Sequence, residues 1–170
     1  MIEEEWTTIA LRLGLATAIG LALGFEREWR GHDAGLRTHA LVALSAAMIM
    51  LSALMISDDL MRHGSRSDPL RVVQGLAQAI GFIAGGLIFV RSGDVRNMTT
   101  AASLWIAAAA GIAAGAGQFA LVLIGTGMAL LVLTLLSLIK RLMPTRHDPP
   151  AADDELVLPN RRGAIAKTED

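Results

Sequence analysis

Long apolar runs alternate with short polar segments along this chain. The runs cover residues 9–25, 36–56, 72–90, 101–116 and 119–139, and they hold few charged side chains. Each run approaches the ~20 residues that a helix needs to cross ~30 Å of hydrocarbon. The pattern predicts an all-α, polytopic membrane protein with five transmembrane helices, at about 6–25, 37–56, 70–90, 99–117 and 119–139.

The polar segments between the runs predict the connections. SDDLMRHGSRSDP, after the second run, is rich in residues whose backbone needs water, so we expect an aqueous loop. RSGDVRNM predicts a tight turn, and only GQ separates the last two spans. We therefore expect residues 1–139 to form the bundle. Residues 140–170, which carry prolines and mixed charge, are expected to be a disordered tail without a folded C-terminal domain.

Composition agrees with a membrane protein and excludes several other classes. The chain is 53% hydrophobic and 18% charged, with a net charge of −1 and no basic surface for nucleic acid. It has no cysteine, which excludes disulfides, thiolate metal sites and cysteine nucleophiles. The first run follows MIEEEW, whose acidic charge is wrong for a signal peptide. We expect a retained first span and the lipid bilayer as a partner.

The basic residues of the loops predict the orientation, because cytoplasmic loops are enriched in lysine and arginine. One side carries five loop arginines and the six basic residues of the tail, and the other side carries three arginines. The first set is Arg27, Arg30, Arg37, Arg91 and Arg96, and the second is Arg62, Arg66 and Arg71. The C-terminus is therefore expected in the cytoplasm and the N-terminus outside.

Small residues four apart predict where helices approach closely, since packing rather than the hydrophobic effect joins helices in lipid. Three such ladders occur, in the first, third and fourth spans, so we expect these spans to form the tight centre. The alternative is that glycine is simply common in membrane helices. The ladders are Ala16, Gly20 and Gly24; Ala77, Gly81 and Gly85; and Ala107, Gly111 and Gly115.

Other features refine this bundle. The alanine-rich fourth span is expected inside it, and the leucine-rich fifth at its edge. Gln74 and Gln78 share a face with Gly81 and Gly85, which predicts either interhelical hydrogen bonds or part of a pathway. Arg12 lies within the first span, where an isolated charge is costly, so it must reach the interface or a polar partner.

Charged and polar residues gather where the first two spans meet and where the fourth begins. Glu26 and Arg30 are four residues apart and can pair if the first helix continues past Phe25. Two polar segments, AGLRTH and GDVRNMTTAASLW, precede the second and fourth spans on the same side. We predict one cytoplasmic-side cluster, which comprises Glu26, Arg27, Glu28, Arg37, Thr38, His39, Arg96, Thr99, Thr100 and Trp105.

Three ordered motifs carry a family resemblance. The stretches GFEREWRGHDAGLRTHALVAL, RVVQGLAQAIGFIAGG and VRNMTTAASLWIAAAAGIAAGAG resemble the MgtC/SapB family of bacterial inner-membrane proteins over about residues 11–136. Matching residues include the turn Glu26, Arg27 and Glu28. The family's GIGFLGAG reads AIGFIAGG here. Virulence-type members carry a folded cytoplasmic domain after the last span, and here only the tail from Lys140 remains, so functions that need that domain are not implied.

The resemblance implies a multi-pass protein of magnesium homeostasis in the bacterial inner membrane. In pathogens, the family is associated with growth at low magnesium and survival in macrophages. Its members act as regulators, and the best-studied type restrains the proton-translocating ATP synthase. The implied partner is therefore another inner-membrane protein, with ATP synthase as the example.

A regulator and an ion transporter are the two functions to separate. Magnesium keeps several waters and needs only one or two carboxylates, so weak Mg²⁺ binding is the cofactor chemistry to consider. Yet no acidic residue lies in the middle of a span, and the deep charge of Arg12 repels cations. These observations favour a regulator. The alternative is a transporter or channel subunit for magnesium, in which a homo-oligomer forms the pore.

Catalytic chemistry is not expected. The histidines at 32, 39, 63 and 147 are scattered, and no serine stands in a nucleophile motif. Glu26 and Glu28 would point about 160° or more apart on a continuous helix, which is poor geometry for a paired acid and base. We expect neither an enzyme nor a tightly bound cofactor, and the sequence assigns no metal ligands.

Overall fold

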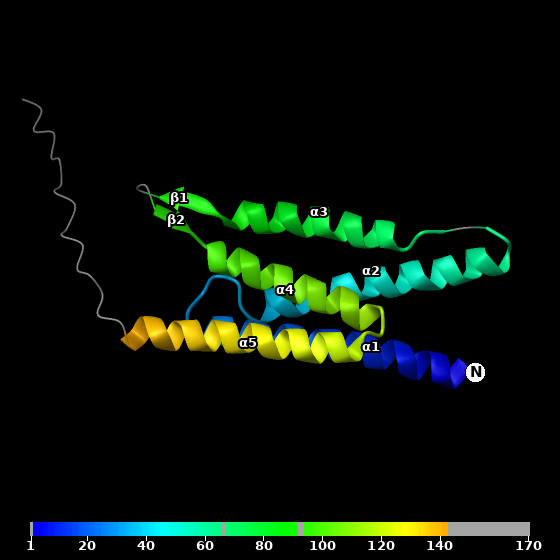
Figure 1. The fold of residues 1–170 in the computed structure, drawn as a ribbon, viewed down its shortest axis with the longest axis horizontal. Helices are drawn as coiled ribbons and strands as arrows, with labels where there is room; N and C mark the ends of the chain where they lie inside the picture. Colours follow the sequence, from blue (N-terminus) through cyan, green and yellow to red (C-terminus); the bar gives the residue numbers. More distant parts are fainter. Residues whose placement is uncertain (1, 66, 92–93, 143–170) are drawn as a thin grey trace, which may run out of the picture.

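The computed structural model describes residues 2–65, 67–91 and 94–142, which form five helices and one short hairpin (Figure 1). Each helix is long and apolar enough to cross a membrane, so the predicted polytopic α-helical fold is confirmed. The predicted disordered tail lies outside the described residues from position 143 onward. In chain order the elements are α1 Ile2–Trp29, α2 Leu36–Arg62, α3 Leu70–Leu87, β1 Phe89–Arg91, β2 Asp94–Arg96, α4 Met98–Gly115 and α5 Phe119–Leu142.

The helices extend beyond several predicted ends. α1 continues through the charged residues to Trp29, and α2 continues into the predicted aqueous loop as far as Arg62. In that last turn, Nη2 of Arg62 donates a hydrogen bond of 2.7 Å to Oδ2 of Asp58, one turn earlier. Pairs at this spacing favour helix, which explains why the polar segment begins with helical residues.

The third span ends earlier than predicted. α3 stops at Leu87, and residues 89–96 form an antiparallel hairpin in which Phe89 pairs with Arg96 and Val90 with Val95. The tight connection predicted for RSGDVRNM is present, and the two short strands that flank it were not predicted. β-Branched and aromatic residues favour extended backbone, and strand pairing satisfies backbone groups at the end of the bundle.

The centre of the bundle consists of α1, α2 and α4. A Cβ placed on Gly20 would lie 2.6 Å from Cα of Ala40, and one on Gly24 would lie 2.7 Å from Cα of Leu36. Farther along the same face of α2, Gly111 and Gly115 of α4 approach the backbone of Ala43 and Ala47 in the same way. α2 therefore packs against both glycine-bearing helices at distances that exclude a side chain.

The prediction that the third span belongs to this centre was wrong. Ile80 is buried and belongs to the stripe by which α3 faces the bundle, together with Leu76 and Ala84. A Cβ on Gly85 would meet no described atom within 4 Å, and one on Gly81 would touch only the ring edge of Trp105 at 4.0 Å. Bulky residues rather than the small-residue ladder thus form the inner face of α3.

The burial of the last two helices agrees with the prediction. In α4, 61% of the residues of the apolar window are buried, against 11% in α5. Alanine gives α4 a narrow cross-section between α1 and α2, and leucine gives α5 an apolar outer surface. α5 lies along the bundle in Figure 1, with its C-terminal end at the same end of the bundle as the hairpin.

Arg12 meets a polar partner, which is one of the two predicted outcomes. Its Nη1 donates a hydrogen bond of 2.9 Å to the backbone carbonyl of Gly115, in the last turn of α4. The carbonyl groups of a final turn lack intrahelical partners and carry partial negative charge. The arginine therefore caps α4 immediately before the turn into α5.

Candidate functional site

The predicted polar cluster maps to one end of the bundle, which we call the hairpin end. There the α1–α2 connection, the β1–β2 hairpin, the start of α4 and the end of α5 come together (Figure 1). The sequence predicted ten residues for one cluster. The structure divides them into buried residues that contact one another across helices and exposed residues around the rim.

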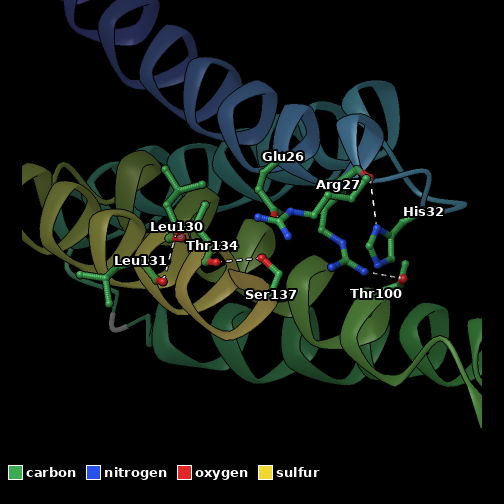
Figure 2. A network of polar contacts seen from close by, with 9 residues as sticks. Glu26, Arg27, His32, Thr100, Leu130, Leu131, Thr134 and Ser137 are labelled. Atoms are coloured by element: carbon green, nitrogen blue, oxygen red, sulfur yellow. Dashed lines mark hydrogen bonds and ion pairs between the residues drawn. The ribbon is translucent and has the colours of Figure 1, made fainter. Parts of the chain in front are cut away.

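Arg27 joins α1 to α4. Its side chain is 3% exposed, and its Nη2 donates a hydrogen bond of 2.9 Å to Oγ1 of Thr100, which is also buried. Figure 2 shows the guanidinium directed from α1 toward Thr100. The backbone carbonyl of Arg27 also accepts a bond from the backbone N–H of His32 at 3.1 Å, which ends the helix in a turn. A charged donor in this buried position holds the two helices in one register.

His39 joins α2 to the same part of α4. It is fully buried, with Nδ1 2.9 Å from the carbonyl of Gly35 and Nε2 3.0 Å from Oγ of Ser103. Ser103 Oγ in turn lies 2.8 Å from the carbonyl of Thr100. The carbonyl of Gly35 can only accept, so Nδ1 of His39 carries a proton. The Ser103 hydroxyl has one proton, which it donates either to the Thr100 carbonyl or to Nε2 of His39.

These contacts form one polar network that links three helices. Its members are Arg27, His39, Thr100 and Ser103. All four side chains are buried, and the Gly20 contact of the bundle centre lies at the backbone carbonyl of His39. Buried polar groups stabilise one arrangement of their surroundings when each has a partner. The network therefore fixes how α1 and α4 sit against α2.

Glu26 is the acidic member of the buried set. It forms an ion pair with Nε of Arg30, one turn later, as its spacing predicted. The Glu26 side chain is 9% exposed and neither oxygen has a well-directed hydrogen bond. It borders a cavity of about 670 Å³ between α1, the start of α4 and α5, which Arg27, Arg30 and Ser137 also line. Figure 2 shows Glu26 on the side of α1 that faces Ser137.

A second, more apolar cleft of about 890 Å³ adjoins this cavity. It runs between α1 and α5, with Glu26 and Arg30 at its polar end. Apolar and small side chains line the rest of it, among them Ala18, Leu21, Ala22, Phe25 and Leu130. The hairpin end thus offers both signs of charge next to an apolar groove.

Two further contacts fix the loops around the site. Oε2 of Glu28 accepts a hydrogen bond of 2.8 Å from the backbone N–H of Leu36, in the first turn of α2. Nδ2 of Asn97 donates to Oδ2 of Asp33 at 3.1 Å, which ties the start of α4 to the α1–α2 connection. Glu28 therefore acts on the positive end of the α2 dipole and lies apart from the polar network.

Besides Glu28, five of the predicted residues lie outside the buried cluster. Arg37, Thr38, Thr99 and Arg96 are exposed at the rim, and Thr99 lines the cavity beside Glu26. Trp105 lies on a different face of α4, where it borders a space next to Leu76 and Ile80 of α3. The prediction that Trp105 joins the charged site was therefore wrong. Trp105 follows Thr100 by five residues, which places the two side chains on different faces of the helix.

Sequence reasoning missed several residues of the site. Ser103 follows Thr100 by three positions, and this helical spacing was the signal that could have placed it in the network. Asn97 has a left-handed backbone with φ of 66°, which asparagine tolerates better than most residues, so its place before α4 was also readable. The Asp33 contact depends on the tertiary fold and had no local signal.

The described residues contain no group of three or more histidine, aspartate or glutamate side chains arranged to hold a metal ion. Glu26 is close to two arginines, and its nearest acidic neighbour in sequence, Glu28, is exposed and bonded to α2. A hard divalent cation needs several oxygen ligands. Within this region, the single carboxylate of Glu26 could bind Mg²⁺ only weakly and through water.

Comparison with known proteins identifies the family. Residues 13–142 match the profile of the MgtC family, which covers the hairpin-end residues and all but the beginning of the bundle. The chain belongs to the MgtC family. Within that family, the described bundle of α1–α5 corresponds to the matched region almost completely.

Individual relatives agree with this assignment. YhiD of Escherichia coli K12, whose name describes it as a candidate magnesium transporter, is 40% identical over 124 residues, which are 72% of this chain and 58% of YhiD. MgtC of Salmonella typhimurium is 40% identical over 109 residues, 64% of this chain and 44% of MgtC. SrpB of Synechococcus elongatus is 32% identical over 173 aligned positions, which cover 90% and 94% of the two chains.

The matches differ in how much of each relative they include. The chain spans 51% and 58% of the length of the relatives from Synechocystis and Escherichia coli, but nearly all of SrpB. No solved structure gave a significant match. The comparisons therefore establish the MgtC family, and the five helices of membrane-spanning length agree with a multi-pass membrane protein.

Proposed function

We propose that this MgtC-family protein is a regulator of magnesium homeostasis in the bacterial inner membrane and acts by binding another membrane protein. The observation that carries the proposal is the internal use of the hairpin-end charges. Arg27 bonds Thr100, Glu28 caps α2, and Glu26 pairs with Arg30. Polar groups engaged in this way support a fixed shape that a partner can recognise.

The closed centre of the bundle also supports regulation over transport by a single chain. Backbone contacts at Gly20 and Gly111 leave no room for a hydrated ion between α1, α2 and α4. A cation that entered at the hairpin end would meet Arg27 and Arg30 beside the one buried carboxylate of the described residues. Both arginines repel it, and no catalytic step forms part of the proposal.

The cleft between α1 and α5 is the surface we assign to partner contact. It combines an apolar groove between two membrane-spanning helices with the charged side chains of Glu26 and Arg30 at one end. A helix of another membrane protein can bury its apolar side there and place a polar residue near the ion pair. By the family resemblance stated above, the proton-translocating ATP synthase is the partner to test first.

Site-specific photocrosslinking in native membranes tests this assignment. A photoreactive residue at Thr134, which lines the cleft, is expected to capture an ATP synthase subunit detectable by antibody. The matched control is Leu131, which is 57% exposed on α5 and does not line the cleft. Purified protein should also inhibit proton pumping in inverted vesicles. Equal capture at both positions, or no inhibition, would contradict the proposal.

The orientation is part of the proposal. We place the hairpin end in the cytoplasm and the N-terminus outside, because the arginine-rich connections lie at the hairpin end. Since the chain has no cysteine, single cysteines report accessibility without background. A cysteine at Ser65, in the α2–α3 connection, is expected to react with an impermeant maleimide added outside, and one at His32 is not. The reverse pattern would invert the topology.

A transporter or channel subunit for magnesium is the second candidate. The feature that favours it is the Glu26 carboxylate, which borders a cavity of about 670 Å³ and has no well-directed hydrogen bond. In this reading Glu26 binds hydrated Mg²⁺ weakly as the ion passes, and several copies form the path. Transport would then require Glu26, whereas regulation requires the shape of the cleft.

A further inference from the structure

The outward face of α3 carries polar side chains beside the exposed Phe82 and Ile83, whereas its buried residues are all apolar. Leu76, Ile80 and Ala84 turn toward the bundle, whereas Gln74 and Gln78 are exposed. Gln78 lies at the middle of the 18-residue helix Leu70–Leu87, so its amide stands at the level of the hydrocarbon and not at the headgroups. Against lipid, a face of this kind is unfavourable.

Neither glutamine has a side-chain hydrogen bond within the described part of the chain. An amide that stays unpaired in hydrocarbon loses the bonds it makes in water and gains none. The helix is therefore incomplete on this face, and a partner that offers amide or similar groups would complete it.

The same face continues into the glycines of α3. Positions 74, 78, 81 and 85 recur at intervals of four, three and four, which aligns them along one seam of the helix. Gly85 has open space around it among the described residues, and Gly81 touches only the edge of Trp105. Glutamines occupy one half of this seam and glycines the other, so one half can form hydrogen bonds and the other lets a backbone approach closely.

We propose that this α3 seam, formed by Gln74, Gln78, Gly81 and Gly85, is the contact surface for a second copy of the chain. Copies in one membrane share orientation and depth, so a two-fold axis along the membrane normal places each seam residue opposite itself. An amide is both donor and acceptor, so glutamines that face each other bond reciprocally. None of the four seam residues is charged. The inference is independent of the proposed regulatory function, which uses α1 and α5.

Disulfide crosslinking of the full chain in native membranes tests the seam. The absence of native cysteine allows single variants Gln78→Cys and Gly85→Cys, each oxidised in otherwise unchanged protein. The control is Ala79→Cys, which is also exposed, lies at almost the same depth and points about 100° away on the helix. Seam cysteines are expected to give at least tenfold more crosslinked dimer than Ala79→Cys.

Three outcomes would overturn the proposal. These are equal yields at positions 78 and 79, no dimer from either seam cysteine, and adducts whose mass shows a different protein. The last result would assign the face to another membrane protein.

A second measurement removes the amides and leaves the buried stripe of α3 unchanged. The double variant Gln74→Leu, Gln78→Leu is expected to lower the association constant of the dimer in lipid by about tenfold. Single-molecule photobleaching, which counts the copies in each complex, measures this constant. Circular dichroism of the same sample checks that the helices are retained. Association as strong as in the unaltered protein would show that the seam is not the interface. If the double variant does not fold, the crosslinking yields of the cysteine variants decide whether the seam is the interface.

Discussion

The contact between Gly111 and α2 makes a quantitative prediction about stability. A Cβ on Gly111 would fall on the carbonyl group of Ala43, and backbone atoms cannot rotate away as a side chain can. Overpacking of a tight site costs about 1–3 kcal/mol, so we expect about 3 kcal/mol for Gly111→Ala. Alanine also favours helix by about 1 kcal/mol over glycine, which leaves a net loss of about 2 kcal/mol.

Gly125 of α5 provides the matched control. It is exposed, and a Cβ there would meet no described atom within 4 Å, so Gly125→Ala keeps only the gain of about 1 kcal/mol in helix propensity. The two variants should therefore differ by about 3 kcal/mol, or about 100-fold in the unfolding equilibrium constant. Reversible unfolding in mixed detergent micelles, followed by circular dichroism, measures this difference. Equal stabilities for the two variants would refute the assignment of α2 to the bundle centre.

The same unfolding assay tests three further contacts. Thr100→Val leaves the buried guanidinium of Arg27 without its acceptor and should lower the free energy of unfolding by about 2 kcal/mol. The control Thr99→Val, at the exposed neighbour, should change it by less than about 0.5 kcal/mol. Similar losses in the two variants would show that the polar network does not stabilise the bundle. Arg12→Met removes the cap of α4 and should lower the free energy of unfolding by about 1 kcal/mol, and Arg71→Met, at an exposed arginine, is the control. A gain in stability for Arg12→Met would show that the charge of Arg12 destabilises the bundle. Glu28→Ala removes the acceptor at the start of α2 and should cost about 1 kcal/mol, a reading that an unchanged Tm would contradict.

The number of spans and their order of burial could be predicted because each depends on local composition. Apolar runs near 20 residues define α1–α5, and alanine against leucine content separates the inner α4 from the outer α5. The charged turn was likewise readable, since Glu26 and Arg30 are one helical turn apart.

The neighbour of each helix could not be predicted in the same way. Gly85 and Gly111 stand in ladders of the same form, yet one faces outward and the other meets the backbone of α2. A ladder shows that close approach is allowed, and the rest of the helix decides which face turns inward. The bond between His39 and Ser103 spans 64 positions, so it depends on how α2 and α4 pack and on no local pattern.

Magnesium flux into proteoliposomes that contain the purified protein tests the central claim most directly. The claim is that the hairpin-end charges and the glycine contacts hold α1, α2 and α4 in a closed bundle that regulates a partner and conducts no cation. With a fluorescent magnesium indicator inside the vesicles, the account predicts uptake equal to that of protein-free vesicles and no effect of Glu26→Gln. Saturable uptake that Glu26→Gln abolishes would contradict it.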